Sequence, residues 1–371
     1  MPKIKIIELF QSYSEFYQPY IPPVIEALKK RKEIEIQVHA FNGDKNGEVQ
    51  IIPSYKKRKL KEKYYNLKSL KSPKLNFLEI TAIQNKVDIV HIQHSFLFPK
   101  TLGLLKLQAE QRPKIIITLR GGDTYVKPWY YNNWTQFYKN YGSLVDAFIT
   151  VSEHQKKYLH EKWHIEKNRI HAIPVSVNNT FEIQPKYPNI DTLKIVSAFR
   201  MTWEKNIEGS IQFAKSLKDK NIPFVYDIFG DGNDLGQLYY LVDKYQLHNY
   251  VNIKGKIDND ELLLQLPKYD FFVQLSISEA LSVSVLEAQS VGLPCVVSNS
   301  DGLVEAVIRN KTAIVEDYLE IDKLVNSCIE LWKNKDEYHN FSKNAINFVK
   351  SNFTVEHEVD KMVKLYQSLI K

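Results

Sequence analysis

The stretch from Ser276 to Val307, SISEALSVSVLEAQSVGLPCVVSNSDGLVEAV, contains two glutamates, Glu279 and Glu287, with seven residues between them. The run YDFFVQLS that leads into it is apolar and rich in aromatic and β-branched residues, which predicts a buried strand. Ser282 or Ser284 can cap the start of a helix with the body VLEAQSVG, and PCVVS predicts the next strand. The stretch therefore predicts a strand, a helix and a second strand.

This arrangement suits a phosphorylated ligand. The loop after the first strand opens towards the helix N-terminus, where free amides and the helix dipole favour a phosphate. Glu279 lies in that loop and Glu287 in the helix, so both can face one ligand. Carboxylates accept hydrogen bonds from hydroxyls, and a sugar nucleotide has two hydroxyl-rich rings flanking a diphosphate. The pair alone is equally compatible with a solvated loop glutamate and an ordinary helix glutamate.

Length and composition bound the class of protein. A chain of 371 residues predicts two domains, and 44% hydrophobic with 25% charged residues is typical of a globular protein. No apolar run has the length of a membrane span, and the opening MPKIKIIELF predicts a strand rather than a signal peptide. We therefore expect a cytoplasmic protein. Cys295 and Cys328 are far apart and predict neither a disulfide framework nor a metal site.

The net charge of +7 is distributed unevenly, because residues 56–74 hold nine Lys or Arg against one acid, Glu62. Tyrosines and leucines alternate with these charges. Two interpretations stay open: a solvated charged face, or an amphipathic segment bound to an anionic membrane surface, where each Lys or Arg contributes about 1 kcal/mol. No nucleic-acid partner is expected, since no recognisable nucleic-acid motif accompanies the charge.

Both halves of the chain alternate short apolar strands with helical patterns, which predicts α/β domains with parallel sheets. In the first half, 101–111 is predicted to form one helix. The polar, proline-bearing stretch 182–194 predicts a linker. We expect an N-terminal domain over 1–185, a second domain over 186–352, and a C-terminal helix, 353–371, that packs back on the first domain. Two such domains imply a cleft, a preferred place for small-molecule sites.

Two further loops follow predicted strands of the second half. LKIVSAFR runs into MTWEKN and places Arg200 and Lys205 where two cations can neutralise the charge of a departing diphosphate. Surface charge is the alternative. FVYDIFGDGN places Gly230 and Gly232 where a backbone can approach a nucleotide closely, although the same pattern makes ordinary turns.

Taken together, these features resemble the retaining glycosyltransferases of family 4, which have the GT-B fold of two Rossmann-like domains facing across a cleft. The resemblance covers nearly the whole chain and is strongest from about 194 to 315. There the motifs Arg200 to Lys205, IFGDGN, VNIKGKI, Glu279 to Glu287, GLPCVVS and DGLVEAV occur in the family's order. VDIVHIQH, ITLRGGD, AFITVSE and IHAIP match more weakly in the first half.

The resemblance implies a role for each matching residue. Glu287 binds the ribose hydroxyls, Glu279 contacts the transferred sugar, and the amides of Ala280, Leu281 and Ser282 hold the sugar and phosphate. The remaining expected contacts are with the diphosphate, from Arg200 and Lys205, and with the base, from Lys256 and Ile257 with Gly230 and Gly232 nearby. No metal or other cofactor is expected, because the basic pair and the helix N-terminus replace a cation.

The chain departs from the family at three positions and in one loop, since SYSEFYQPYIPP replaces the glycine-rich first loop of many members. Ala280 and Ser282 stand where the family has glycines, and Arg120 stands where it often has a histidine before a GxD-like turn. A guanidinium is not a base near neutral pH, so Arg120 is expected to pair with a phosphate.

The expected activity is transfer of a hexosyl group, with retention, from a nucleoside diphosphate sugar to a hydroxyl of a saccharide or lipid-linked saccharide. The resemblance implies a place in the synthesis of a surface polysaccharide, such as a capsule, O-antigen or exopolysaccharide. The expected location is the cytoplasm, and a peripheral position on the inner face of the cell membrane stays open with the interpretation of the basic segment. Two alternatives stay open: a nucleotide-sugar epimerase or hydrolase of the same fold, and an inactive scaffold in a polysaccharide-assembly complex.

Overall fold

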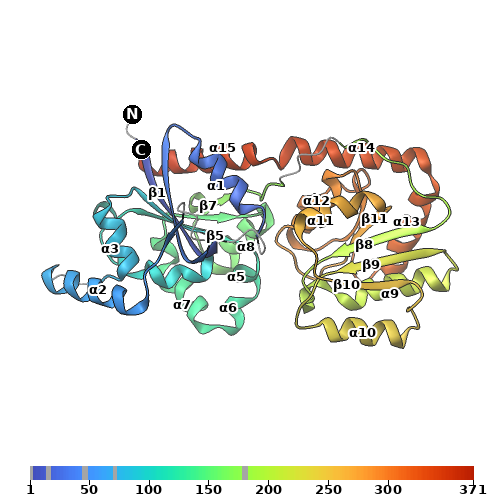
Figure 1. Cartoon of the computed structure of the whole chain (residues 1–371), viewed down its shortest axis with the longest axis horizontal. Helices are drawn as coiled ribbons and strands as arrows, with labels where there is room; N and C mark the ends of the chain where they lie inside the picture. The colour runs from blue at the N-terminus through green and yellow to red at the C-terminus, as the bar shows by residue number, and fades with distance from the viewer. Residues whose placement is uncertain (1–2, 14–17, 44–48, 70–72, 178–182) are drawn as a thin grey trace. The chain divides into compact units, whose positions relative to one another are not determined.

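The computed structural model describes residues 3–13, 18–43, 49–69, 73–177 and 183–371. The chain divides into two compact units (Figure 1). The first unit comprises Met1–Pro174 together with Val355–Lys371, and the second comprises Val175–Thr354.

The described strands of the first unit form a seven-stranded parallel sheet in the order β3-β2-β1-β4-β5-β6-β7. Its central strands are short, mostly apolar and buried, except for Lys114 at the start of β5, as expected for a parallel sheet covered on both faces. The strand bounds are β1 Ile4–Tyr13, β2 Ile34–Gly43, β3 Val49–Ile51, β4 Ile89–Ile92, β5 Lys114–Leu119, β6 Ala147–Thr150 and β7 Ile170–Ala172.

Helices connect these strands, and the last helix of the chain joins them. Their bounds are α1 Ile21–Lys29, α2 Tyr55–Ser69, α3 Phe77–Gln84, α4 Leu102–Leu105, α5 Gly122–Tyr125, α6 Lys127–Tyr130, α7 Asn132–Tyr141, α8 Glu153–Trp163 and α15 Val355–Ile370. Helix α15 lies beside α1 (Figure 1) and places Met362 and Tyr366 in the same apolar core. The Tyr366 hydroxyl donates to Glu8 Oε1 at 2.9 Å and lies 2.8 Å from Nδ1 of His91. The C-terminal helix is therefore part of the first unit.

The described strands of the second unit form a six-stranded parallel sheet in the order β10-β9-β8-β11-β12-β13. Its strands are β8 Leu193–Ala198, β9 Phe224–Phe229, β10 Val251–Gly255, β11 Phe271–Gln274, β12 Cys295–Ser298 and β13 Ala313–Glu316. Its helices are α9 Ile207–Asp219, α10 Leu235–Lys244, α11 Asn259–Gln265, α12 Val283–Ser290, α13 Ile321–Lys333 and α14 Lys335–Asn352.

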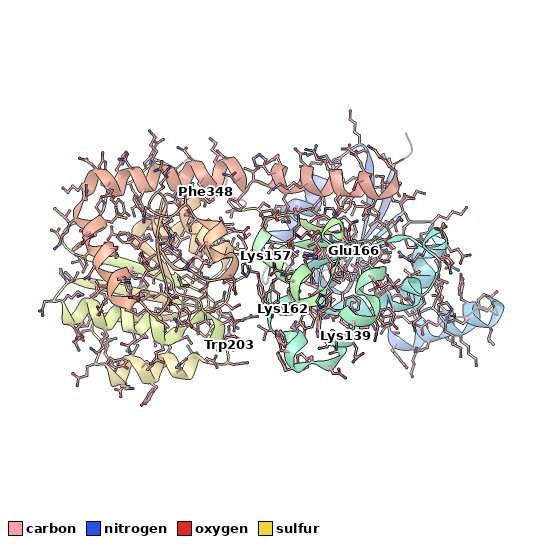
Figure 2. All side chains as sticks on the ribbon, turned by 180° about the vertical axis from the view of Figure 1, so that it is seen from behind. Lys139, Lys157, Lys162, Glu166, Trp203 and Phe348 are labelled. Carbon is pink, nitrogen blue, oxygen red and sulfur yellow. The ribbon has the colours of Figure 1, made fainter. Side chains whose placement is uncertain are left out.

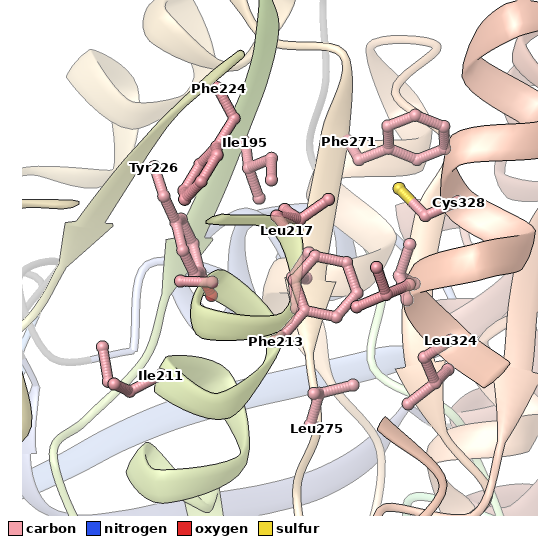
Figure 3. Packing of buried hydrophobic residues seen from close by; sticks show 14 of the residues in the cluster. Ile195, Ile211, Phe213, Leu217, Phe224, Tyr226, Phe271, Leu275, Leu324 and Cys328 are labelled. Atoms are coloured by element: carbon pink, nitrogen blue, oxygen red, sulfur yellow. The ribbon is translucent and has the colours of Figure 1, made fainter. Parts of the chain in front are cut away.

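One apolar core packs against these strands (Figure 3). Phe213 and Leu217 of α9 lie between strand residues such as Ile195 and the α13 residues Leu324 and Cys328, and all of them are buried. Cys328 is a free thiol in this core. The loops that follow β8, β9, β10, β11 and β12 therefore start from a rigid base.

The polar stretch expected as a linker is bound to the second unit where it is described. Lys186 is largely buried and donates from Nζ to the carbonyl oxygens of Pro267, at 3.0 Å, and Tyr269. The amide of Asn189 donates to Asp270 at 2.8 Å. The division between the units lies at Pro174 and Val175, before the expected boundary at 185/186. Within the second unit, the amide of Val177 donates to the carbonyl of Phe353 at 2.9 Å.

The prediction of one helix over 101–111 was wrong. The structure has a single α-helical turn, α4, followed by a 3-10 turn at Ala109–Gln111. The buried carboxylate of Glu79 accepts from the amides of Gly103, at 2.5 Å, and Leu104, at 3.0 Å, which caps α4. The amide of Leu107 then bonds the carbonyl of Leu104 at 2.9 Å, a three-residue spacing that ends the α-helical ladder.

Candidate functional site

The predicted strand, helix and strand are β11, α12 and β12, which pair in parallel within the sheet. Of the two serines expected to cap the helix, Ser282 does so, because its Oγ accepts from the amide of Val285 at 3.3 Å. The loop 275–282 lies at the carboxyl edge of the sheet, where ligands of open parallel sheets bind. The amides of Val283 and Ser284, which begin α12, have no carbonyl partner within the helix and can bind an anion.

Lys205 and Glu279 form an ion pair across this edge, although they are 74 residues apart in sequence. Their side chains are only 16% and 13% exposed. Lys205 ends a 3-10 turn, Trp203–Lys205, that follows β8, and Glu279 lies in the loop after β11. The Glu279 carboxylate also accepts from Gln274 Nε2 at 2.9 Å. The structure therefore brings together two of the three expected catalytic residues.

Arg200, the third, points elsewhere. Its guanidinium pairs with Glu204 at 3.2 Å, and its side chain is 71% exposed. The carbonyl of Glu204 accepts from the amide of Ile277 at 2.8 Å, so the loop after β8 is attached to the loop after β11. The two expected basic residues thus point in different directions: Lys205 lies against Glu279, and Arg200 faces solvent. Trp203, between them, is exposed at the surface of this unit (Figure 2).

Glu287 is buried in α12 and has one described hydrogen-bond partner. Asn259 Nδ2 donates to its Oε1 at 2.6 Å. Burial raises the pKa of Glu287 to about 7, and the bond from Asn259 offsets part of that rise. Asn259 begins α11, directly after the loop that contains Lys256 and Ile257. This contact places the predicted base-binding loop next to the predicted ribose-binding glutamate.

Close contacts with the protein backbone explain why positions 230 and 232 are glycine. A Cβ on Gly230, whose φ is +129°, would lie 1.9 Å from the carbonyl oxygen of Phe199. A Cβ on Gly232 would lie 2.3 Å from the carbonyl oxygen of Met201. Both glycines therefore let the loop after β9 pack on the loop after β8, and their approach to a nucleotide stays a prediction. Lys256 pairs with Asp231 between them, at 3.3 Å.

Ala280, Leu281 and Ser282 are buried, so the chain after Glu279 turns its side chains inwards. Two hydrogen-bond partners of the glutamates were missed from the sequence: Gln274, which contacts Glu279, and Asn259, which contacts Glu287. Both are polar residues next to apolar or charged neighbours, and the fold of the second unit brings Asn259 to Glu287. The signal that could have indicated Gln274 is a carboxamide that ends an otherwise apolar strand.

Arg120 lies in the first unit, in the loop after β5. Its Nη2 donates to Gln93 at 2.8 Å, and its guanidinium lies 5.4 Å from the ring centre of Tyr20. Asp123 accepts from the amides of Arg120 and Gly121 at 3.1 Å and shapes this turn. Burial, with a further contribution from Arg120, lowers the pKa of His94 to about 4, so His94 is neutral beside the guanidinium. Arg120 is thus a fixed cation at the carboxyl edge of the first sheet.

The described residues contain neither a cluster of metal ligands nor a helix that could span a membrane. No group of three or more His, Cys, Asp or Glu there is arranged to hold a metal ion. No described helix is both long and apolar enough to cross a bilayer.

Comparisons with known families identify the class of protein. Residues 24–181 match the family described as Glycosyltransferase Family 4, and residues 179–348 match the family described as Glycosyl transferases group 1. Together the two matches span residues 24–348. The chain belongs to the glycosyltransferases that these two families describe.

Two curated proteins from Escherichia coli are similar to this chain. The putative colanic acid biosynthesis glycosyltransferase WcaL is 27% identical over 188 residues, which are 49% of this chain and 46% of that protein. The protein named UDP-Gal:alpha-D-GlcNAc-diphosphoundecaprenol alpha-1,3-galactosyltransferase is 24% identical over 311 residues, 77% of each chain. The match therefore spans about half the length of the first relative.

Solved structures share the fold over the whole chain. A glycosyltransferase from Rickettsia africae superposes with a TM-score of 0.72 and 19% identity, covering 100% of both chains. The Anabaena protein HepE, solved in complex with UDP, superposes with a TM-score of 0.73 and 15% identity, covering 98% of this chain and 100% of that one. The fold is GT-B, with a Rossmann-like parallel sheet in each unit.

The raised pKa of Glu287 predicts a pH-dependent stability difference in the Glu287→Gln variant. The folded carboxyl titrates near pH 7 and the unfolded one near 4.5, so this group's contribution to stability is present below 4.5 and is lost as pH rises through 7. Glutamine carries no charge to desolvate. Relative to wild type, the variant should therefore gain about 2–3 kcal/mol of unfolding free energy between about pH 5 and pH 8.

Urea-unfolding midpoints over this pH range measure the difference. Glu330→Gln, an exposed glutamate of α13, is the matched control and should show none of this pH dependence. A stability difference between the Glu287→Gln variant and wild type that is flat with pH would contradict the raised pKa.

Proposed function

We propose that this protein transfers a hexosyl group from a nucleoside diphosphate sugar to a hydroxyl of a saccharide or lipid-linked saccharide, with retention of the anomeric configuration. The observation that carries the proposal is the contact between Lys205 and Glu279 beside the N-terminus of α12, with Glu287 in the same helix. A cation, free amides and carboxylate acceptors converge there, which is the set of groups that a sugar diphosphate requires.

The donor would lie along the loops after β8, β10 and β11. The Glu287 carboxylate accepts hydrogen bonds from the ribose hydroxyls, and the loop at Lys256 and Ile257 contacts the base. Uridine is the first base to test, because relatives in this family carry UDP or UDP-Gal in their names. Glu279 contacts the transferred sugar, while the amides around Ser282 hold the phosphate.

Lys205 stabilises the negative charge that develops on the leaving diphosphate. In the ligand-free protein this cation is neutralised by Glu279, so the incoming diphosphate competes with the carboxylate for the ammonium group. Arg200 is exposed and can turn towards the diphosphate once it leaves Glu204. The two cations and the helix N-terminus together replace a metal ion, and we propose transfer without one.

No described side chain in this loop is placed as an obvious nucleophile. Transfer with retention then proceeds by substitution on one face of the sugar, in which the leaving phosphate accepts the proton of the acceptor hydroxyl. This route agrees with the role of Lys205, because a cation on the diphosphate lowers the cost of breaking the glycosidic bond.

The fixed positive charge of Arg120 in the first unit supports the proposal that the acceptor is an anion. The relative named for a diphosphoundecaprenol acceptor indicates one chemical class for it, a saccharide linked to a lipid through a diphosphate. Surface polysaccharide synthesis uses acceptors of this class, and the name of the colanic acid relative points to the same process. We propose that Arg120 pairs with the acceptor's phosphate.

The first functional test is turnover of UDP-galactose with N-acetylglucosaminyl diphosphoundecaprenol, followed by mass spectrometry. The expected result is a product heavier by one hexose, unchanged in amount by EDTA. Lys205→Met should lower kcat about 100-fold, because it removes charge stabilisation from the leaving group. Lys215→Met is the matched control, since Lys215 also pairs with a carboxylate but lies on α9, and its activity should be unchanged.

Other outcomes would contradict transfer. Free galactose or an isomerised donor in the absence of acceptor would indicate the hydrolase or epimerase. No stabilisation of the protein by UDP, GDP, CMP or ADP in a thermal-shift screen would indicate an inactive scaffold.

The basic segment forms helix α2, at the edge of the first unit beyond α3 (Figure 1). Polar side chains attach it to the fold. Asn66 exchanges two hydrogen bonds with the backbone of Leu75, at 2.8 and 2.9 Å, and Glu62 accepts from the amide of Phe77 at 3.0 Å. Lys61 donates to Thr81 at 3.3 Å.

The opposite face of α2 is apolar and basic. Leu60, Tyr64 and Leu67 follow one another at helical spacing and are 71%, 63% and 67% exposed. Lys56 and Lys63 flank them and are also exposed. Water-facing leucines and tyrosine among lysines are typical of a helix that lies in a membrane interface. We therefore propose that this face binds an anionic membrane surface; residues 70–72 of the basic segment lie outside the described residues.

Co-sedimentation with phosphatidylcholine vesicles, with or without phosphatidylglycerol, tests this contact. Wild type should bind the anionic vesicles, and exchanging Lys56 and Lys63 for Gln should weaken binding by about 2 kcal/mol. Leu60→Ser with Leu67→Ser should weaken it further. Leu319→Ser changes an equally exposed leucine of the second unit and is the control. Equal binding of the α2 variants and wild type would show that this face is only solvated.

A further inference from the structure

Gln274 is the last residue of β11, and its side chain is fully buried. The three residues before it, Phe271, Phe272 and Val273, are apolar and also buried. A carboxamide at such a position costs free energy unless each of its donors and acceptors has a partner. An apolar side chain would fill the same space without that requirement.

Every hydrogen-bonding position of the Gln274 carboxamide is occupied. Its Nε2 donates to Glu279 Oε2 at 2.9 Å and to Ser276 Oγ at 3.2 Å. Its Oε1 accepts from Ser282 Oγ at 2.8 Å and from Ser284 Oγ at 3.1 Å. Two donors and two acceptor sites are the full capacity of this group. Gln274 therefore has no hydrogen bond left for a ligand.

The partners of Gln274 connect two parts of the candidate site. On one side is Glu279, which Lys205 also contacts through the same oxygen, Oε2. On the other side is Ser282, the residue whose Oγ caps α12. Oε1 of Glu279 accepts no hydrogen bond from the described residues and is left for a ligand. The hydroxyls of Ser282 and Ser284, in turn, both donate to Gln274 Oε1.

We propose that Gln274 is a positioning residue that fixes the Glu279 carboxylate relative to the N-terminus of α12, and so sets the geometry of the donor-sugar subsite. The inference rests on the proposed function, because it names a determinant of that same site. In the ligand-free protein, bonds from both Lys205 and Gln274 to one oxygen hold the carboxylate in a single orientation. When the diphosphate takes over Lys205, the bond from Gln274 keeps the other oxygen presented to the sugar. Ser282 and Ser284 contribute to this positioning, since their hydroxyls donate to the carboxamide oxygen of Gln274.

The test uses Gln274→Met, which keeps the length and volume of the side chain but loses its hydrogen bonds. Calorimetry should show weaker binding of UDP-galactose, by about tenfold, and unchanged binding of UDP, because Glu279 is assigned to the sugar and Glu287 to the nucleoside. In the Glu279→Ala background, Gln274→Met should have no further effect on UDP-galactose binding. This non-additivity is the signature of a residue that acts through another.

Gln289→Met is the matched control. Gln289 is a fully buried glutamine of α12 whose Nε2 bonds the carbonyls of Ala306, at 2.6 Å, and Val285, at 3.2 Å, and it does not contact Glu279. Its replacement should lower stability and leave the ratio of UDP-galactose to UDP affinity unchanged. If Gln274→Met lowers both affinities together, or changes stability only, Gln274 is merely structural and the proposal is wrong.

A ligand-free measurement separates this proposal from the proposed function. A crystal structure of the Gln274→Met variant should show α12 unmoved and the Glu279 carboxylate in a different orientation. An unchanged Glu279 would overturn the positioning role even if the wild type transfers galactose. A displaced Glu279 in a protein that binds no nucleotide sugar would support the positioning role and reject the proposed function.

Discussion

The ion pair between Lys205 and Glu279 joins the loop after β8 to the loop after β11 at the carboxyl edge of the second sheet. Both side chains are largely withdrawn from water, so an opposite charge must accompany each of them. In the ligand-free protein each charge compensates the other. A diphosphate can take over the ammonium group from Glu279, and a sugar hydroxyl can take over the carboxylate. The pair is thus a stable resting state for two groups whose proposed partners belong to one ligand.

The rest of the second unit holds this pair in place. β8 and β11 are neighbours in the sheet, and the core formed by α9 and α13 supports the sheet from one side. The backbone contact from Ile277 to Glu204 and the carboxamide of Gln274 then fix the two loops. Glu287 differs from Glu279 in having no cation partner among the described residues, and its pKa is raised accordingly. Two glutamates of one motif therefore lie in different electrostatic surroundings, because Glu279 is paired with a lysine and Glu287 is buried with a raised pKa.

Much of this arrangement could be predicted from the sequence, because apolar strand runs and a capping serine are local signals. The strand, helix and strand at 271–298 follow from them, and so does the parallel direction of the strands in both sheets. The contacts of Asn259 and Gly230 could not be predicted, since their partners are distant in sequence and depend on strand order. Those of Gln274 are with residues close in sequence, but they depend on how the loop after β11 folds. Helix α2 shows the same limit: its leucines would usually face the core, but polar bonds from Asn66 and Glu62 turn them towards solvent. Arg200 was expected beside Lys205, yet a local pair with Glu204 holds it outside.

Binding of UDP-galactose at about pH 6 and about pH 8, measured by calorimetry on wild type and on Glu287→Gln, tests the account most directly. The donor's diphosphate does not titrate in this range, so the pH dependence reports the protein. If ribose hydroxyls bond to an ionised Glu287 whose free pKa is about 7, wild type should bind about tenfold more tightly at the higher pH. The variant should bind weakly and equally at both. Affinity of the wild type that is independent of pH, or equal to that of the variant, would contradict the assignment of Glu287 to the donor.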